Sequence, residues 1–246
     1  RTTGFEKAGL IEAVDNSLKR LQTDYIDLYQ LHWPERFTNT FGKRGYKHLK
    51  DEIWKDNFKE VLQTLEEIIK SGKIRHIGIS NENPWGTMRF LEEAKNDLPR
   101  MITIQNPYSL LNRQFEVGNA EVSMQENIGL LAYSPLGCGV LSGKYIEKKD
   151  SPNSRLNLFK RFVRYSSNQS TEAAKLYLEI ANRHNISLTS LALAFINQQP
   201  FVTSNIIGAT NLDQLQENID SIYVSLNNDV IKEIEKVHEM IPDPAT

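Results

Sequence analysis

The chain has 246 residues and a formal net charge of −2, so no bulk attraction to nucleic acid or to an anionic membrane is expected. Its single cysteine, Cys138, excludes a disulfide within the chain and fits a reducing compartment such as the cytoplasm. No apolar run approaches the ~20 residues of a membrane span. The length resembles the roughly 250 residues of a complete (β/α)8 barrel, but the number of predicted strands does not support a complete barrel.

Apolar residues recur at helical spacing in three early segments, and a short apolar run typical of a strand follows each one. Gly72 suits the end of the second helix, and Pro84 suits the first turn of the third. The polar and aromatic residues 34–56 predict a long insertion rather than a linker. The predicted helices span residues 6–22, 58–70 and 84–97, and the strands span 25–31, 75–79 and 101–104.

The remaining sequence continues this alternation. Asn211, with Gln214 three residues later, forms a capping-box pattern at the start of a helix. We expect that helix to bury an apolar face, and we expect the C-terminal tail PDPAT to be frayed. The expected apolar face comprises Leu212, Leu215, Ile219 and Ile222. The other predicted elements are helices over residues 116–126, 171–184, 188–198 and 229–240, and strands from Gly129 and over 205–207.

Five strand–helix units with nearly all-apolar strands predict a parallel sheet covered by helices. In α/β folds of this kind, ligands bind at the carboxyl ends of the strands. One polar residue at the start of a loop is ordinary, but five polar clusters in register favour a shared site. These clusters are His32, Ser80-Asn81, Gln105-Asn106, Tyr133-Ser134 and Gly208-Ala209-Thr210.

The stretch GLLAYSPLGCGVLSGKY, residues 129–145, combines an apolar run, an aromatic ring, a hydroxyl, a glycine loop and a lysine. Glycines let the backbone approach a ligand closely, and clustered N–H groups bind anions. One interpretation is a cradle for a phosphate and a ring; the other is a strand followed by an ordinary surface loop. The basic loop that follows leaves two similar alternatives, a phosphate contact or a solvated loop. Its basic residues are Arg155, Lys160, Arg161 and Arg164.

Several other chemistries lack their sequence patterns. The spacing Gly137-x-Gly139-x-x-x-Gly143 has one residue too many for a dinucleotide fingerprint and opens no clear helix. No G-x-S-x-G motif indicates a serine hydrolase. None of the five histidines pairs with another at metal-ligand spacing, so we expect no metal site.

Five motifs in chain order resemble the successive strand ends of the aldo-keto reductases, and the resemblance covers essentially the whole chain. The motifs are YIDLYQLHWP, IGISN, TIQNPYSLLNR, LAYSPLGCGVLSGKY and IIGATNLDQLQENI. The insertion WPERFTNTFGKRGY and the run NPYSLLNRQFEVG resemble the Tas-like branch of that family. The resemblance implies an α/β fold, a (β/α)8 TIM barrel with NADPH across its C-terminal face.

The resemblance also implies roles for individual residues. His32 resembles the histidine of the catalytic tetrad, which orients the substrate. Ser80, Asn81 and Gln105 resemble the group that holds the nicotinamide carboxamide, and Tyr133 resembles the aromatic residue that stacks on the ring. Further NADPH contacts are implied along the pyrophosphate loop and at the adenosine end, where Glu217 and Asn218 would read the adenine. These residues are Ser134, Pro135, Leu136, Gly137, Cys138, Gly139, Leu141, Lys144, Arg155, Gly208, Ala209, Thr210, Gln214, Glu217 and Asn218.

The chain departs from the family in its number of units. Eight strands close the family's barrel, whereas five are predicted here. The tetrad Asp, Tyr and Lys belong to the family's first units, which no segment matches, and Tyr29 would point to the opposite face of its strand from His32. We therefore expect residues 1–246 to be one barrel domain without its first three βα units, and activity of this portion alone is left open.

Two functions of different classes remain. The first is a cytoplasmic NADPH-dependent oxidoreductase that reduces small-molecule aldehydes or ketones to alcohols by hydride transfer. The second is a non-catalytic NADPH-binding barrel subunit, similar to the redox-sensing β-subunits of potassium channels. A weaker alternative is an unrelated phosphate-binding lyase or isomerase. His32 favours the reductase because it keeps the tetrad residue type at its strand end.

Overall fold

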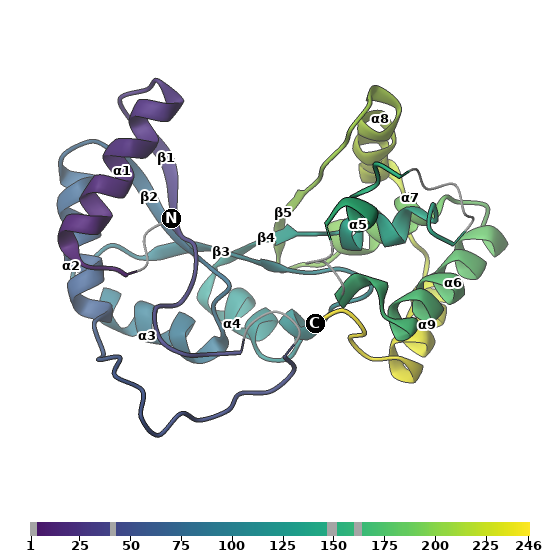
Figure 1. The fold of residues 1–246 in the computed structure, drawn as a ribbon, viewed down its shortest axis with the longest axis horizontal. Helices are drawn as coiled ribbons and strands as arrows, with labels where there is room; N and C mark the ends of the chain where they lie inside the picture. Colours follow the sequence, from purple (N-terminus) through teal and green to yellow (C-terminus); the bar gives the residue numbers. More distant parts are fainter. Residues whose placement is uncertain (1–3, 40–42, 147–151, 160–163) are drawn as a thin grey trace. The chain divides into compact units, whose positions relative to one another are not determined.

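The computed structural model describes residues 4–39, 43–146, 152–159 and 164–246 (Figure 1). Among these residues, five strands alternate with helices in the predicted order. The strands are β1 (Ile26–Leu31), β2 (Ile74–Ser80), β3 (Met101–Pro107), β4 (Gly129–Tyr133) and β5 (Val202–Ile206). The α-helices are α1 (Lys7–Leu21), α2 (Phe58–Lys70), α3 (Pro84–Ala94), α4 (Asn119–Glu126), α5 (Arg155–Leu158), α6 (Asn168–Arg183), α7 (Leu188–Asn197), α8 (Leu212–Asp220) and α9 (Asn228–Met240). Short 3-10 helices are η1 (Gln114–Glu116), η2 (Gly137–Ser142) and η4 (Ser221–Tyr223). Lys160 and Arg161 of the predicted basic loop lie outside the described residues.

The described residues form two compact units. Unit 1 contains those within 1–40, 45–106 and 118–130, and unit 2 contains those within 41–44, 107–117 and 131–246. The expectation of one barrel domain over residues 1–246 stays a prediction, and so does the absence of the first three βα units.

Unit 1 is built on parallel strands. β2 pairs with β1, placing Leu31 opposite Ile79, and with β3, placing Ser80 opposite Gln105. A parallel pair needs a crossover connection, and α2 and α3 provide the helices of these crossovers. The predicted parallel sheet is therefore confirmed for these strands, and their carboxyl ends lie at one edge.

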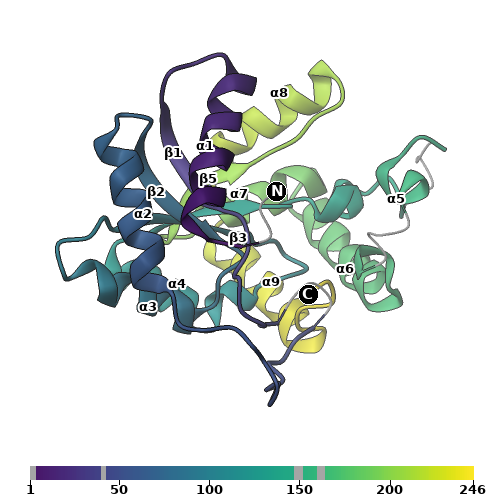
Figure 2. The ribbon, with the colours of Figure 1, turned by 60° about the vertical axis from the view of Figure 1, so that its left-hand side comes forward.

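The helices of unit 1 form where apolar spacing and capping residues predict them. α2 runs from Phe58 to Lys70, as predicted, and lies beside α1 and β2 (Figure 2). Gly72 follows it with a φ of +78°, the left-handed conformation that suits glycine after a helix. Asn83 caps α3 by accepting a hydrogen bond from the Gly86 N–H at 3.1 Å, and Pro84 occupies the first turn. The face of α2 is buried through Phe58, Val61, Leu62, Leu65 and Ile68.

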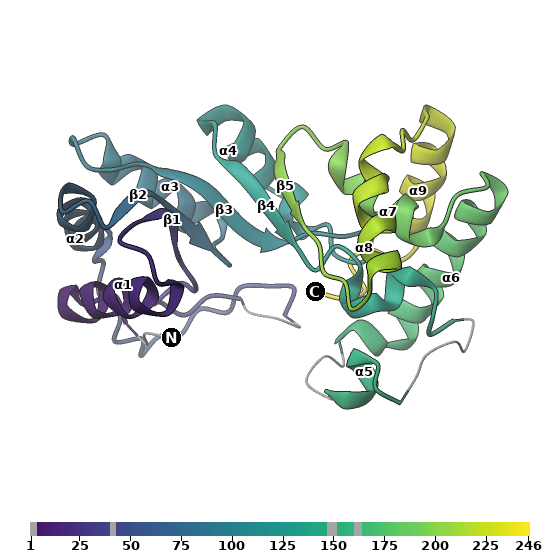
Figure 3. The same ribbon diagram turned by 90° about the horizontal axis from the view of Figure 1, so that it is seen from above.

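Unit 2 is centred on α7. This helix packs against α6, α8, β5, η2 and η4, and Figure 3 shows it beside α6 and α8. Leu188, Thr189 and every residue from Leu191 to Ile196 are buried, a pattern typical of a helix surrounded by protein rather than one with a single apolar face. The side chain of Ser187 caps the helix by accepting from the Ser190 N–H at 3.0 Å.

The prediction that α8 buries its apolar face is wrong. Leu212 is 81% exposed, Leu215 39%, Ile219 48% and Ile222 62%. Helical spacing places these side chains on one face, but burial requires a neighbouring surface. The predicted cap at Asn211 is confirmed, since its side chain accepts from the Gln214 N–H at 2.9 Å. The capping box is displaced by one residue, because the Gln214 side chain accepts from the N–H of Thr210 rather than that of Asn211.

The prediction of a frayed C-terminal tail is also wrong. Ala245 is fully buried, and its N–H donates to the carbonyl oxygen of Leu111 at 3.0 Å. Asp243 accepts a hydrogen bond from the Arg113 N–H at 2.6 Å, and the Ser170 hydroxyl donates to the carbonyl oxygen of Pro244 at 3.1 Å. Tails fray when their backbone groups lack partners, whereas these groups have partners far away in the sequence.

Several boundaries differ from the predictions; β5, for example, spans Val202–Ile206 rather than residues 205–207. The helix expected over residues 116–126 begins only at Asn119, because Gly118, with a φ of +104°, separates α4 from the preceding 3-10 helix η1. β3 continues to Pro107, so Gln105 and Asn106 lie within the strand rather than after it. Propensity indicates that an element exists more reliably than where it ends.

None of the helices in the described ranges is both long and apolar enough to cross a membrane. The same residues contain no group of three or more His, Cys, Asp or Glu side chains that could hold a metal ion.

A pH-dependent contact joins α6 to α9. Arg183 and His184 both bond to the carboxylate of Glu233, the His184 Nε2 at 3.0 Å, and these contacts lower the pKa of Glu233. A carboxyl whose pKa is lowered on folding stabilises the protein above its unfolded pKa, and that stabilisation is lost as pH falls through the folded pKa. Glu233→Gln is therefore expected to reduce stability at neutral pH and to have no effect at strongly acidic pH. Urea unfolding of both proteins across this range measures the difference, and a difference that does not shrink on acidification would contradict the linkage.

Candidate functional site

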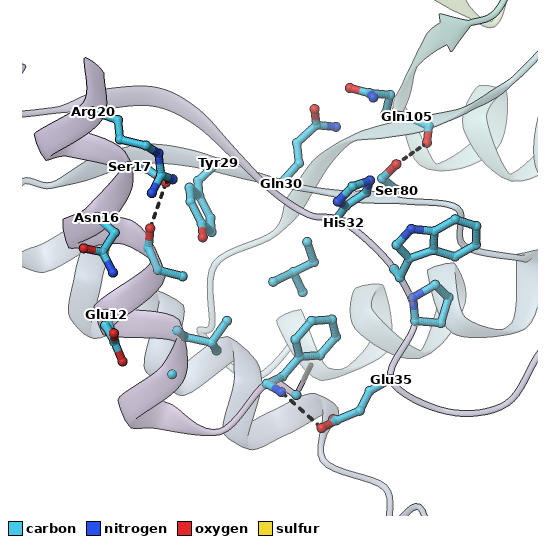
Figure 4. Close-up of a pocket in the computed structure, with 18 residues that line it drawn as sticks. Glu12, Asn16, Ser17, Arg20, Tyr29, Gln30, His32, Glu35, Ser80 and Gln105 are labelled. Carbon is cyan, nitrogen blue, oxygen red and sulfur yellow. Dashed lines mark hydrogen bonds between the residues drawn. The ribbon is translucent and has the colours of Figure 1, made fainter. Parts of the chain in front are cut away.

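Four of the predicted site residues meet at the strand ends of unit 1: His32, Ser80, Asn81 and Gln105. Ser80 is the last residue of β2, and its hydroxyl donates to the carbonyl oxygen of Gln105 in β3 at 2.6 Å (Figure 4). The Asn81 N–H donates to the same oxygen at 3.1 Å. The Asn81 side-chain amide donates to the carbonyl oxygen of His32 at 2.8 Å and to the Ser80 hydroxyl at 3.1 Å. These contacts connect the ends of β1, β2 and β3.

Asn81 has an uncommon backbone conformation. Its φ is +56°, in the left-handed region, which asparagine tolerates better than most residues. This conformation turns the chain sharply out of β2 and leaves the side-chain amide directed back toward the end of β1. The sequence Ser-Asn after a strand therefore produces a compact polar corner.

A cavity of about 940 Å³ opens beside this corner, within unit 1. α1 and β1 line it, together with His32, Ser80 and Gln105 (Figure 4). His32 is exposed, whereas Ser80 is 4% exposed. A ligand in this cavity would meet an imidazole, a hydroxyl and an amide, groups that donate and accept hydrogen bonds.

Tyr29 and Gln30 point to different faces of β1. The Gln30 side-chain amide donates to the carbonyl oxygen of Ile79 at 3.3 Å, on the side of His32 and Ser80, while Tyr29 lies toward α1 (Figure 4). Burial raises the pKa of the Tyr29 phenol, and the charge of Arg20 acts in the opposite direction. This alternation agrees with the expectation that Tyr29 is directed away from His32.

The glycine loop after β4 belongs to unit 2 and folds as a series of tight turns. Ser134, Gly137, Cys138, Gly139 and Gly143 all have positive φ. The N–H groups of Gly137 and Gly139 donate to carbonyl oxygens within the loop, both at 2.9 Å. These two N–H groups already have partners within the loop, so they are not available to an anion.

Cationic side chains gather around Cys138. Burial raises the pKa of its thiol, while the charge and hydrogen bond of Arg155, and the charges of Arg164 and Lys144, act to lower it. Lys144 lies directly over Gly139, because a Cβ added to that glycine would be 2.9 Å from the Lys144 Nζ. The predicted loop lysine and Arg155 therefore reach the same small region, as a site for a phosphate requires.

Other predicted residues of this loop are buried. Pro135 and Leu141 are buried, and the carbonyl oxygen of Leu136 accepts from the N–H groups of Gly139 and Leu141. Tyr133 is partly buried, which raises the pKa of its phenol, and its carbonyl oxygen accepts from the Tyr108 N–H at 3.2 Å. The side chains of Pro135 and Leu141 thus support the loop rather than face outward.

Tyr165 and Arg164 are additional members of this region. Tyr165 is 1% exposed, and its ring packs against Gly137, where an added Cβ would be 3.3 Å from the ring. Arg164 donates to the Tyr165 hydroxyl at 2.9 Å. Sequence reasoning placed Arg164 in a basic loop and did not identify Tyr165, because nothing in that irregular segment indicates which residue returns to the glycine turn.

The six predicted residues of the adenosine end lie in the loop after β5 and in α8, which contains Gln214, Glu217 and Asn218. The Asn218 side-chain amide donates to the carbonyl oxygen of Gly208 at 3.2 Å, which ties α8 to the loop before it. The Gln214 side chain accepts from the Thr210 hydroxyl at 3.0 Å, and Glu217 accepts from the Ser187 hydroxyl at 2.6 Å. Gly208, Ala209 and Thr210 are exposed, so this loop is accessible to a ligand.

Comparison with known proteins gives consistent matches. The model of the Aldo/keto reductase family matches residues 1–239. The chain is 51% identical over 247 residues to Protein tas of Escherichia coli (strain K12), covering 98% of this chain and 70% of that protein. It is 38% identical over 255 residues to an aldo-keto reductase of Babesia bovis, covering 98% of this chain and 90% of that protein. It is 28% identical over 249 residues to L-glyceraldehyde 3-phosphate reductase of Escherichia coli (strain K12), covering 98% of this chain and 65% of that protein.

Proposed function

Because the chain belongs to the aldo/keto reductase family, in its Tas-like branch, and is an oxidoreductase, we propose that it reduces aldehydes or ketones to alcohols with NADPH. The observation that carries the proposal is the convergence of His32, Ser80, Asn81 and Gln105 beside one cavity. When bound, reduced nicotinamide supplies the hydride, and the protein supplies position and electrostatics. A reducing compartment such as the cytoplasm is part of the same proposal.

The residues of unit 1 suit the carboxamide of nicotinamide. A hydroxyl has one donor and two acceptor lone pairs, and the Ser80 donor is already directed at Gln105. Ser80 would therefore accept from the carboxamide NH2 group, beside the amides of Asn81 and Gln105. His32, exposed at the end of β1, would orient the substrate carbonyl.

The residues of unit 2 suit the rest of a dinucleotide. Tyr133 would offer its ring to the nicotinamide, and Lys144 with Arg155 would bind phosphate. The preference for NADPH over NADH rests on these two cations. Gly208, Thr210, Gln214, Glu217 and Asn218 would hold the adenosine end, where the exposed loop leaves room for it.

A non-catalytic subunit is not favoured. Relatives in the comparison carry the names of reductases, among them the aldo-keto reductase of Babesia bovis and L-glyceraldehyde 3-phosphate reductase. The second name describes reduction of an aldehyde that bears a phosphate, which agrees with the carbonyl substrate class proposed here. The location of the tetrad Asp, Tyr and Lys outside this chain stays a prediction.

Loss of the His32 imidazole is expected to reduce turnover. His32→Ala should lower kcat/KM on the order of 10²-fold, because a misplaced substrate loses that much rate, while the Kd for NADPH changes little. The measurement is a titration of the complete gene product with NADPH by cofactor fluorescence, followed by loss of reduced-cofactor absorbance on addition of an aromatic aldehyde. His76→Ala, at an exposed histidine on β2, is the matched control. Binding without turnover across a panel of carbonyls would favour the non-catalytic subunit, and no binding would contradict the cofactor assignment.

The position of Lys144 depends on the absence of a side chain at residue 139. Gly139 has a φ of +93°, and an added Cβ would lie 2.8 Å from the Lys144 Cε. Gly139→Ala should displace Lys144 and weaken NADPH binding about tenfold, since hydrogen bonds to charged groups contribute about 1.5–3 kcal/mol. Gly143→Ala is the control, because Gly143 has a φ of +80° and no atom within 4 Å of an added Cβ. Equal weakening by both substitutions would show that backbone strain, rather than the lysine, is responsible.

A further inference from the structure

A buried ion pair lies directly behind the polar corner of unit 1. Arg36, in the segment after β1, donates to the carboxylate of Glu82 through both terminal nitrogens, at 2.8 and 2.6 Å. The two side chains are 8% and 3% exposed. The Arg36 guanidinium also lies 4.8 Å from the ring centre of Trp85 and 5.8 Å from that of Phe58. A charge pair this deeply buried needs partners at every polar group.

Glu82 is bonded through all of its acceptor groups. Its carbonyl oxygen accepts from the side-chain amides of Asn106 at 2.8 Å and Asn119 at 3.1 Å. Its carboxylate accepts from Arg36 and from the N–H of Asn83 at 2.7 Å. The carboxylate also lies against the first turn of α3, since a Cβ added to Gly86 would be 2.4 Å from it. Residues from four segments of chain, namely the β1–α2 connection, the start of α3, β3 and α4, therefore hold Glu82 in place.

Glu82 is the residue that follows Asn81. Asn81 has the left-handed φ of +56°, and such conformations persist when surrounding structure over-determines them. Ser80 secures the chain before Asn81 through its bond to Gln105, and Glu82 secures the chain after it. The direction of the Asn81 side chain thus depends on two anchors, and the ion pair is part of the second.

Arg36 brings a distant segment into this arrangement. It lies in the segment that joins β1 to α2, and it also donates to the Asn83 side chain at 3.2 Å. The same Asn83 side chain donates to the hydroxyl of Thr38 at 2.7 Å. Arg36 and Thr38 therefore contact Glu82 and Asn83, the two residues that follow Asn81 in the sequence.

We propose that Arg36 and Glu82 are positioning residues that hold Asn81 in its ligand-binding conformation. Ligand binding at Asn81 then depends on residues 36–38 being structurally ordered. The proposal rests on the proposed function insofar as the ligand is the nicotinamide carboxamide. Neither side chain contacts the ligand in this arrangement. Their effect passes through the backbone of Glu82 to the Asn81 side chain.

The test compares Arg36→Met, Glu82→Gln, the double variant and the control Asp15→Asn, which removes a carboxylate from an exposed pair with Lys73. Each single variant leaves a buried group without its partner, so both should be less stable. The double variant has no unpaired buried charge, so it avoids the cost of leaving one charge of a buried pair without its partner. It should therefore recover the thermal midpoint, while its Kd for NADPH stays raised about tenfold. Asp15→Asn should change neither quantity.

Recovery of both the thermal midpoint and the Kd in the double variant would overturn the proposal, because the pair would then be structural only. Hydrogen exchange of the Asn81 N–H, which donates to Gln105, supplies a readout without ligand. Exchange should be about tenfold faster in the single and double variants than in the wild type or Asp15→Asn. Unchanged exchange in the double variant would also overturn the proposal. If the wild type fails to bind NADPH, the proposed function fails, and the exchange measurement alone decides on the positioning role.

Discussion

Replacing Arg113 with methionine is expected to destabilise the protein by about 1–3 kcal/mol, the cost of leaving partly buried carboxylate acceptors without their donor. The Arg113 guanidinium is 7% exposed and bonds to both carboxylate oxygens of Glu116 at 2.7 Å and to Glu235 at 3.1 Å. Burial acts to lower the pKa of Arg113, but its bonds to Glu116 and Glu235 prevail and raise it. Without Arg113, the Glu116 carboxylate would keep only the hydrogen bond that it accepts from the Tyr108 hydroxyl.

Arg183→Met is the matched control for this experiment. Arg183 also pairs with a glutamate, Glu233, but its side chain is 55% exposed. Exposed pairs contribute about 0–1 kcal/mol, so its loss should have little effect on urea unfolding at neutral pH. Similar losses of stability in the two variants would contradict the role of burial at Arg113.

Leu193→Ala is expected to cost about 2–5 kcal/mol, since it removes a buried side chain and leaves a cavity. Leu193 lies in the middle of α7 and is 0% exposed. Leu212→Ala makes the same chemical change on α8, where the side chain is 81% exposed, and it should change stability by no more than about 0.5 kcal/mol.

Urea unfolding of the two leucine variants in parallel tests the burial of α7 and the exposure of α8 together. The sequence alone predicts that Leu212 faces inward, whereas the structure exposes its side chain. Sequence and structure therefore predict opposite effects of Leu212→Ala on stability. A loss at Leu212→Ala as large as that at Leu193→Ala would show that α8 is covered in solution.

The strand-end site was largely predictable from the chain. Parallel strands place their carboxyl ends at one edge, so polar residues after β1 and β2 were expected to meet those near the end of β3. His32, Ser80, Asn81 and Gln105 do meet in unit 1. Glu82 and Arg36 were not predicted, because a charge in a loop is normally solvated and nothing local indicates that these two are buried together.

The glycine loop shows a different limit. Its glycines indicated tight turns, and the positive φ values of Gly137, Gly139 and Gly143 agree. The prediction that its N–H groups bind an anion depended on their being available, but those of Gly137, Gly139, Leu141 and Gly143 donate within the loop. Tyr165 reaches the same loop from a segment whose irregular sequence has no periodicity to interpret.

The sequence by itself determined which segments are helices and strands, their order, and the family, because periodicity, caps and strand-end motifs are local properties of neighbouring residues. Tertiary structure decided which amphipathic faces are covered, where the tail binds and which charges are buried. Leu212 and Ala245 show this most directly, one apolar and exposed, the other in a polar tail and fully buried. Burial depends on surfaces supplied by residues distant in the chain, such as Leu111 for Ala245, and no pattern within a helix or tail specifies them.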